Sequence, residues 1–208
     1  EEFNERMKND PEYQLHTEIL PYPFIGDVLG ARVVLLMSNP GYKVSSNIEA
    51  HEKMSDEEKR FVIRAQTQAM LLEDRAIFYS DPEYKSFNDE QDWYWEKKTR
   101  KIREAVSGTE TKIAAVQLMA YHSRKYKSFP EKMGLLPSQE YTKRLVKYLI
   151  DKKDVIFVYA RSKARWLDFV PELENATCVE LSSIRNACLS EKNCKDGGFE
   201  IIKTALTE

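Results

Sequence analysis

Four short runs of apolar residues, separated by longer stretches with helical periodicity, constrain the fold more than any other feature of this sequence. The runs cover residues 33–37, 112–117, 155–159 and 177–181. They are apolar at nearly every position, which is typical of strands buried on both faces of a parallel sheet. Such strands alternating with helices predict an α/β protein, a three-layer α/β/α sandwich with a mainly parallel sheet of four strands.

Apolar residues at helical spacing predict the helices between these strands. A capping box that begins at Ser55 predicts a helix to about residue 74. A second helix is expected over residues 93–106, with Trp95 inward and a solvated lysine face formed by Lys97, Lys98 and Lys101. No repeat or low-complexity linker divides the chain, so residues 1–208 are expected to form a single domain.

Composition narrows the class of protein further. The chain has 208 residues, of which 42% are hydrophobic and 32% charged, and no apolar run approaches the ~20 residues of a membrane-spanning helix. Its first residues resemble no signal peptide, so we expect a cytoplasmic location. The three cysteines form no C-x-x-C pair and favour free thiols over a zinc or iron–sulfur site. We expect a monomer with no metal and no organic cofactor.

The turn after the first apolar run contains the first candidate for chemistry. Ser38-Asn39-Pro40-Gly41 ends the strand, because proline cannot donate to a ladder and glycine opens left-handed turn geometry. In open α/β folds, ligands bind where the carboxyl ends of the strands leave the sheet. Asn39 is therefore a candidate catalytic or binding residue. Asn, Pro and Gly are also ordinary turn residues, so a plain turn is the alternative interpretation.

Basic residues follow the other three runs. If the strands are parallel, the loops that carry them leave the sheet at the same edge as Asn39, and the acidic residues are expected to lie elsewhere. The net charge of −2 does not by itself indicate a nucleic-acid-binding protein. Cations gathered at one edge nevertheless favour phosphate binding over the alternative of ordinary polar loops. The residues are Arg124, Lys125, Arg161, Lys163 and Arg185.

Two motifs resemble those of the uracil-DNA glycosylase superfamily. Gly26-Asp27, the apolar run and then Asn39-Pro40-Gly41 are similar to the first motif of the mismatch-specific, thymine and single-strand-selective glycosylases. Residues 181–187, Leu-Ser-Ser-Ile-Arg-Asn-Ala, resemble the H-P-S-P-R-N-P motif of the single-strand-selective enzymes, with Ser183, Arg185 and Asn186 coinciding. In such enzymes this loop enters the DNA, so the resemblance implies that Asn186 also binds nucleic acid. The resemblance covers most of the chain at the level of fold and about a dozen positions at the level of motifs.

The sequence also departs from the family. The family's motif histidine falls on Leu181, which cannot donate a hydrogen bond. The base-reading asparagine falls on Gln117, whose longer amide still suits a pyrimidine edge, although a plain polar strand end is the alternative. Three further base-binding candidates are Tyr42, His122 and Ser183, and a lone histidine such as His122 can also be structural.

The resemblance implies base excision from DNA, either single-stranded or with a flipped base. The target nucleotide leaves the stack, Asn39 orients a water towards the sugar C1′, and a donor near the pyrimidine O2 stabilises the departing base anion. Because Leu181 removes the usual donor, a weak activity is expected, and Leu181→His is expected to raise it if the loop can seat the ring. The alternative is a non-catalytic member of the same fold that binds nucleic acid or a nucleotide.

Overall fold

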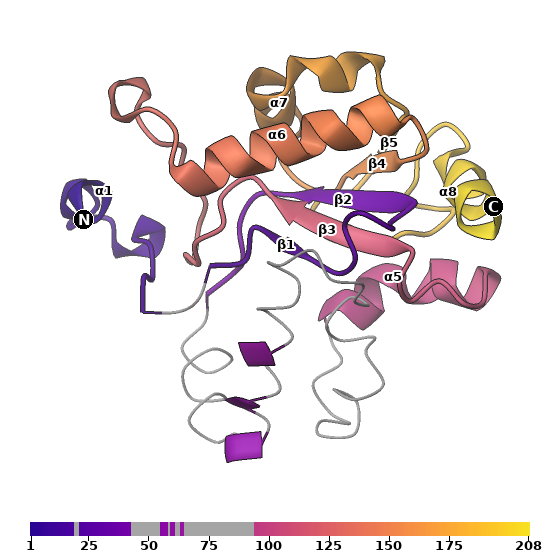
Figure 1. Ribbon diagram of the computed structural model, residues 1–208, viewed down its shortest axis with the longest axis horizontal. Helices are drawn as coiled ribbons and strands as arrows, with labels where there is room; N and C mark the ends of the chain where they lie inside the picture. The colour runs from indigo at the N-terminus through magenta and orange to yellow at the C-terminus, as the bar shows by residue number, and fades with distance from the viewer. Residues whose placement is uncertain (19–20, 43–54, 58, 61–62, 65–93) are drawn as a thin grey trace.

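The computed structural model describes residues 1–18, 21–42, 55–57, 59–60, 63–64 and 94–208, which are coloured in Figure 1. Its centre is a five-stranded sheet with the strand order β1-β3-β2-β4-β5. The predicted apolar runs are confirmed as four parallel strands. The strands are β1 (Phe24–Ile25), β2 (Val33–Met37), β3 (Ile113–Gln117), β4 (Ile156–Tyr159) and β5 (Cys178–Glu180).

The prediction of four strands is wrong, because β1 adds a fifth strand and makes the sheet mixed. Phe24 and Ile25 pair antiparallel with Val116 and Ala115 of β3. The sequence around two prolines predicts only an extended segment here, and two residues are too few to leave a periodic signal. The pairing continues the extended segment, since the backbone amide of Gln117 donates to the carbonyl oxygen of Pro23 at 2.8 Å.

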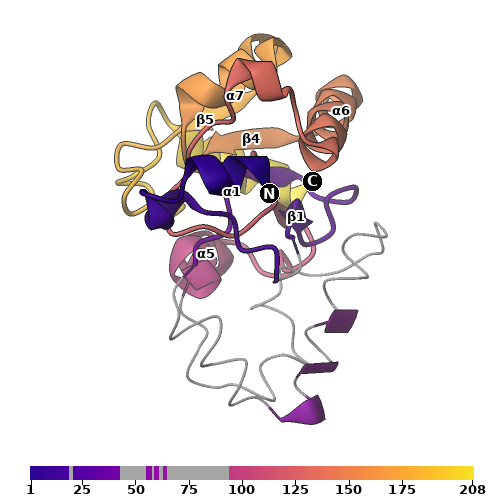
Figure 2. The same ribbon diagram turned by 90° about the vertical axis from the view of Figure 1, so that its left-hand side faces the viewer.

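Helices cover both faces of the sheet. α6 and α7 pack on one face and α5 on the other, as the two views in Figures 1 and 2 show. Side chains alternate along β2 as in any strand: Val33, Leu35 and Met37 join the core with α5 and α8, and Val34 and Leu36 join the core with α6 and α7. The helices are α1 (Glu2–Arg6), α5 (Tyr94–Ala105), α6 (Pro137–Lys152), α7 (Lys163–Phe169) and α8 (Gly198–Thr207), with short 3₁₀ turns η1 (Pro11–Tyr13), η3 (Glu131–Met133) and η4 (Pro171–Asn175).

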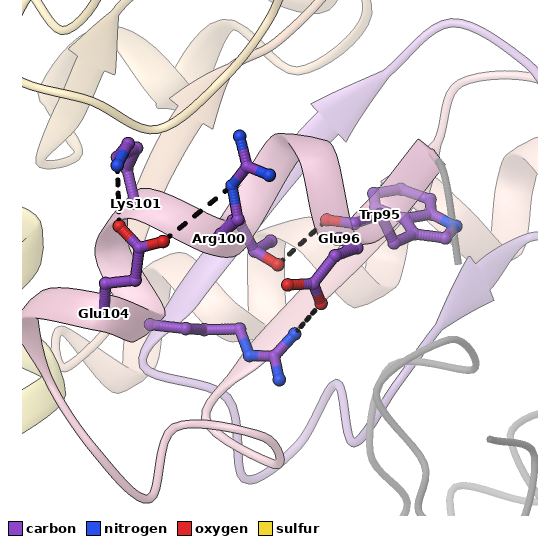
Figure 3. Close-up of polar contacts among 7 residues, drawn as sticks. Trp95, Glu96, Arg100, Lys101 and Glu104 are labelled. Atoms are coloured by element: carbon purple, nitrogen blue, oxygen red, sulfur yellow. Dashed lines mark hydrogen bonds and ion pairs between the residues drawn. The ribbon is translucent and has the colours of Figure 1, made fainter. Parts of the chain in front are cut away.

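α5 confirms the predicted inward face and corrects the predicted lysine face. Trp95 and Ile102 are buried as expected, but Lys98 is also buried, with 5% of its surface exposed. Lys98 lies three residues after Trp95 and four before Ile102, so helical geometry places it on the apolar stripe despite its charge. On the outer face of the helix, Lys101 pairs with Glu104 at 2.7 Å and Arg100 with the same carboxylate at 3.8 Å (Figure 3).

The helix predicted over residues 55–74 falls mostly outside the described residues. Within it, residues 56–57, 59–60 and 63–64 have helical conformation. In the part of the chain that the structure describes, no helix is long and apolar enough to cross a membrane.

Candidate functional site

The carboxyl ends of the four parallel strands meet at one edge of the sheet. The register pairs Met37 with Gln117, Leu36 with Tyr159, and Tyr159 with Glu180. The loops that follow these strands therefore leave the sheet together. The residues that the sequence nominates for the site lie in these loops, except for Gln117, the last residue of β3, and Lys163, the first residue of α7. The strand order reverses at β2, which has β3 on one side and β4 on the other. Ligands of open α/β proteins bind at such a reversal.

A hydrogen bond between two serines joins the loops after β2 and β4 at this reversal. The hydroxyl oxygens of Ser38 and Ser162 lie 2.8 Å apart. Behind them, the indole nitrogen of the fully buried Trp166 donates to the carbonyl oxygen of Met37 at 3.0 Å. The last residue of β2 is thereby held against α7, and the turn that begins at Ser38 starts from a rigid position.

The side chain of Asn39 has a fixed orientation. Its amide nitrogen donates to the carbonyl oxygens of Pro40 at 2.9 Å and Ser123 at 3.1 Å, and to the Ser123 hydroxyl at 2.9 Å. The carbonyl partners identify this atom as the nitrogen, because an amide oxygen would meet two other oxygens there. Its own oxygen, Oδ1, accepts no hydrogen bond from the described residues. The amide therefore offers an oriented acceptor to a ligand or a water.

An aromatic layer lies beside Asn39. The rings of His16 and Tyr42 stack with centroids 3.4 Å apart and planes 9° from parallel. The N-terminal segment brings His16 there, since its backbone amide donates to the carbonyl oxygen of His122 at 2.9 Å. Its imidazole Nδ1 lies 2.6 Å from a carboxylate oxygen of Glu18. His16 therefore covers one face of the Tyr42 ring, which is itself buried, with 7% of its surface exposed.

Glu18 keeps this histidine in place as a carboxylate. Burial raises the pKa of Glu18, but hydrogen bonds from its backbone and from His16, with the charge of the His16 ring, outweigh it and lower the pKa overall.

The predicted base-binding residue His122 is buried and faces the turn of Asn39. Its Nδ1 lies 3.0 Å from the carbonyl oxygen of Gly41. A carbonyl oxygen only accepts hydrogen bonds, so Nδ1 carries the proton, and Nε2 is an acceptor in the neutral ring. His122 can supply a donor at Nε2 only as an imidazolium ion.

Gln117 is buried at the end of β3, with 2% of its surface exposed. By strand alternation it lies on the α5 face, together with Met37. Its side-chain oxygen is enclosed and has no hydrogen-bond partner among the described residues. A buried acceptor without a donor costs about 1–3 kcal/mol, so the Gln117 amide has unused capacity for a ligand or a water.

Asn193 organises the loop after β5, and nothing in the sequence pattern singled it out. Its side-chain oxygen accepts the backbone amide of Ser183 at 2.8 Å. Its side-chain nitrogen lies 3.0 Å from the carbonyl oxygens of both Asn186 and Cys188. One amide thus spans the segment that resembles the second glycosylase motif. Ser183 and Asn186 are exposed on this loop, and the Ser183 hydroxyl accepts a hydrogen bond from the backbone amide of Asn186 at 3.4 Å.

The cations at this edge are not equivalent. Lys125 pairs with Glu12 at 2.9 Å, and Lys163 pairs with Glu180. The expectation that acidic residues lie elsewhere is therefore wrong, because the N-terminal segment and β5 bring carboxylates to these lysines. Three arginines form no ion pair with the described residues, and Arg161 donates instead to backbone carbonyls of the loop after β5. The arginines are Arg124, Arg161 and Arg185.

The described residues hold no group of three or more histidine, cysteine, aspartate or glutamate side chains that could bind a metal ion. The three cysteines are free thiols. The polar groups at the sheet edge are amides, hydroxyls, imidazoles and cations, which suit hydrogen bonding to a base and contacts to phosphate. Comparison with protein-family models, curated proteins and solved structures found no match.

Proposed function

We propose that this chain is a uracil-DNA glycosylase-like protein, which recognises a flipped uracil-type base in DNA at the carboxyl edge of the sheet and excises it slowly. The observation that carries the proposal is the orientation of Asn39. Its nitrogen is occupied by three acceptors, and its oxygen remains to accept a hydrogen bond from a water. The resemblance of the two motifs to those of the glycosylases supplies the reaction.

In this mechanism the chain acts mainly by orienting the water and the flipped nucleotide, and it supplies little acid–base catalysis. The Asn39 oxygen orients a water towards C1′ of the flipped nucleotide, where positive charge develops as the glycosidic bond breaks. An amide is a feeble base, so the rate depends on how the departing base anion is stabilised. The available donors are the Gln117 amide and the Ser183 hydroxyl, because neutral His122 donates to Gly41. Because these two donors are neutral, we expect base excision to be slow.

In this proposal the arginines at the sheet edge, and not the lysines, make most of the contacts to phosphate. Arg124 and Arg185 are exposed and lack a carboxylate partner among the described residues, whereas Lys125 and Lys163 already have one. An ion pair must be broken before such a lysine binds phosphate, which lowers its contribution. Arg161 holds the loop after β5 and lies at the same edge.

Replacement of Asn39 tests the catalytic proposal. With a single-stranded oligonucleotide that contains one deoxyuridine, Asn39→Ala is expected to lower the rate of uracil release by about 100- to 1000-fold, to background if the natural rate is slow. Strand cleavage at the abasic product after alkali treatment measures the rate. Asn175→Ala is the matched control, since Asn175 is exposed next to β5 at the opposite edge. Uracil release that survives Asn39→Ala would contradict the proposed role.

A second candidate function is nucleic-acid binding without cleavage, and one observation favours it. Leu181 lies in the core instead of offering a donor, with 5% of its surface exposed. In this candidate the same edge binds a single strand, and the wild-type chain releases no uracil under any condition of the assay.

The covering of Tyr42 gives both candidates a common prediction about binding. His16→Ala is expected to tighten binding of a short single-stranded oligonucleotide by about tenfold, because a base then stacks on Tyr42 without displacing the imidazole, and such stacking contributes about 1–3 kcal/mol. Fluorescence anisotropy at constant salt measures the affinity. His16→Phe is the control, since it keeps a ring over Tyr42. Equal affinities for wild type and His16→Ala would show that no base stacks there.

A further inference from the structure

Lys98 is a buried lysine that has no countercharge among the residues that the structure describes. Its ammonium lies 4.9 Å from the centroid of the Tyr94 ring, and it forms no ion pair or hydrogen bond with the described residues. Burial lowers the pKa of Lys98, the nearby Cys188 thiol acts in the opposite direction, and the charges of Arg161 and Lys97 lower it further. Taking an unpaired ammonium out of water is unfavourable, so buried charges in proteins are normally paired.

A second cation, Arg161, is close enough for its charge to lower the pKa of Lys98. Arg161 leaves β4 and donates to the carbonyl oxygens of Ile184 and Arg185 in the loop after β5. It also lies beside the hydroxyl of Tyr94: burial raises the pKa of Tyr94, and the charge and hydrogen bond of Arg161 oppose that rise. Carbonyl oxygens satisfy the donors of a guanidinium but do not neutralise its charge.

We name Lys98, Arg161, Tyr94 and Cys188 the Lys98 cluster. α5 supplies two of its members, and the loops after β4 and β5 supply the other two. The backbone fixes this junction, since the amide of Leu189 donates to the carbonyl oxygen of Lys98 at 2.8 Å. The cluster holds two positive charges and no carboxylate, whereas Lys125 and Lys163 at the same edge each have a glutamate.

We propose that the Lys98 cluster is a binding site for a small oxyanion, a phosphate group or a group of the same charge and shape. The anion supplies a countercharge to Lys98 and Arg161, which form no ion pair within the described part of the chain. The Lys98 ammonium has three donors, and the Tyr94 hydroxyl adds another. Two sources fit this chemistry, a free phosphate ion and a phosphate of a polynucleotide backbone. The proposal rests on charge and burial, and it holds whether or not the chain excises uracil.

Thermal unfolding of the full chain at low ionic strength tests the site, with inorganic phosphate titrated against chloride at matched ionic strength. A ligand that binds only the folded chain raises Tm in a saturable way. We expect such a rise for the wild type and its loss in Lys98→Met. Without phosphate, Lys98→Met is expected to unfold a few degrees higher than the wild type, because an unpaired buried charge has been removed. A response of Lys98→Met equal to that of the wild type would overturn the proposal, because phosphate also stabilises proteins non-specifically by exclusion.

Two further variants keep the test decisive. Lys101→Met removes an exposed lysine of the same helix that pairs with Glu104, and it should keep the full phosphate response. Arg161→Gln keeps donors for the two carbonyl oxygens without the charge, and it should weaken phosphate binding at least tenfold. If Lys98→Met does not fold, this variant decides: an unchanged response in Arg161→Gln contradicts the proposed site.

Competition identifies the source of the anion. A single-stranded oligonucleotide without a terminal phosphate is added to the wild type in the presence of rising inorganic phosphate. If inorganic phosphate displaces the oligonucleotide, and Lys98→Met weakens the binding of both ligands, the site binds a phosphate of the polynucleotide backbone. If the oligonucleotide leaves the phosphate response unchanged, the site takes the free ion. Both outcomes support an oxyanion site, and they hold or fail independently of uracil release.

Discussion

Replacement of Trp166 by alanine is expected to lower the free energy of unfolding by about 3–5 kcal/mol, the usual cost of truncating a large aromatic side chain in a core. Trp166 is fully buried in the core between the sheet and α6 and α7. Alanine leaves a cavity there and removes the hydrogen bond from the indole nitrogen to Met37. Urea unfolding followed by circular dichroism measures the loss. A loss below about 1 kcal/mol would show that the core refills the cavity.

Trp166→Phe separates the hydrogen bond from the packing. Phenylalanine keeps much of the ring volume but has no N–H to donate. The carbonyl oxygen of Met37 still accepts the backbone amide of Leu118 at 3.1 Å, so it is not left without a donor. We expect a loss of about 1 kcal/mol from the missing hydrogen bond, plus a smaller packing defect. Because Met37 precedes the turn of Asn39, any uracil release should fall in Trp166→Ala more than in Trp166→Phe.

The layers of the fold were predictable because they depend on short-range patterns. Apolar runs bounded by turn residues locate β2 to β5, and their uniform burial predicts helices on both faces. β1 was missed, because two residues carry no periodic signal and the pairing partner lies far away in sequence. Lys98 is buried although its charge predicts exposure, because it lies on the helical stripe formed by Trp95 and Ile102.

The candidate site was predictable where it depends on the ends of strands. Parallel strands bring their carboxyl ends to one edge, so loops 38–42, 118–125, 160–163 and 181–188 were expected to lie together. The interactions within the edge were not predictable. Asn193 acts through its amide across ten residues, and His16 reaches Tyr42 from the N-terminal segment. The same segment supplies Glu12 to Lys125. Such contacts depend on tertiary packing, which leaves no local pattern in the sequence.

The substitution Leu181→His is expected to destabilise the chain by about 3–5 kcal/mol instead of restoring a donor. Leu181 packs in the core on the α5 and α8 face, with neighbours that include Val158 and Val179. Replacement by histidine removes the hydrophobic stabilisation of the buried leucine, which lowers the free energy of unfolding by about 2 kcal/mol. It also places a polar ring among apolar side chains, which costs about 1–3 kcal/mol more. The sequence alone predicts a gain of activity provided that the loop can seat the ring, because it does not show which way the side chain of residue 181 points.

The pH dependence of this variant identifies the cause of its instability. A buried imidazole must stay neutral in the folded chain, whereas the same imidazole is free to bind a proton in the unfolded chain. Protonation therefore stabilises the unfolded state relative to the folded state as the pH falls from about 8 to about 5. The difference in unfolding free energy between wild type and Leu181→His should therefore widen over that range. Leu181→Met is the control, with a loss below about 1.5 kcal/mol that does not change with pH. A Leu181→His variant that is as stable as the wild type and releases uracil faster would mean that the loop after β5 turns this residue out of the core, into the position that the resembling enzymes give their histidine.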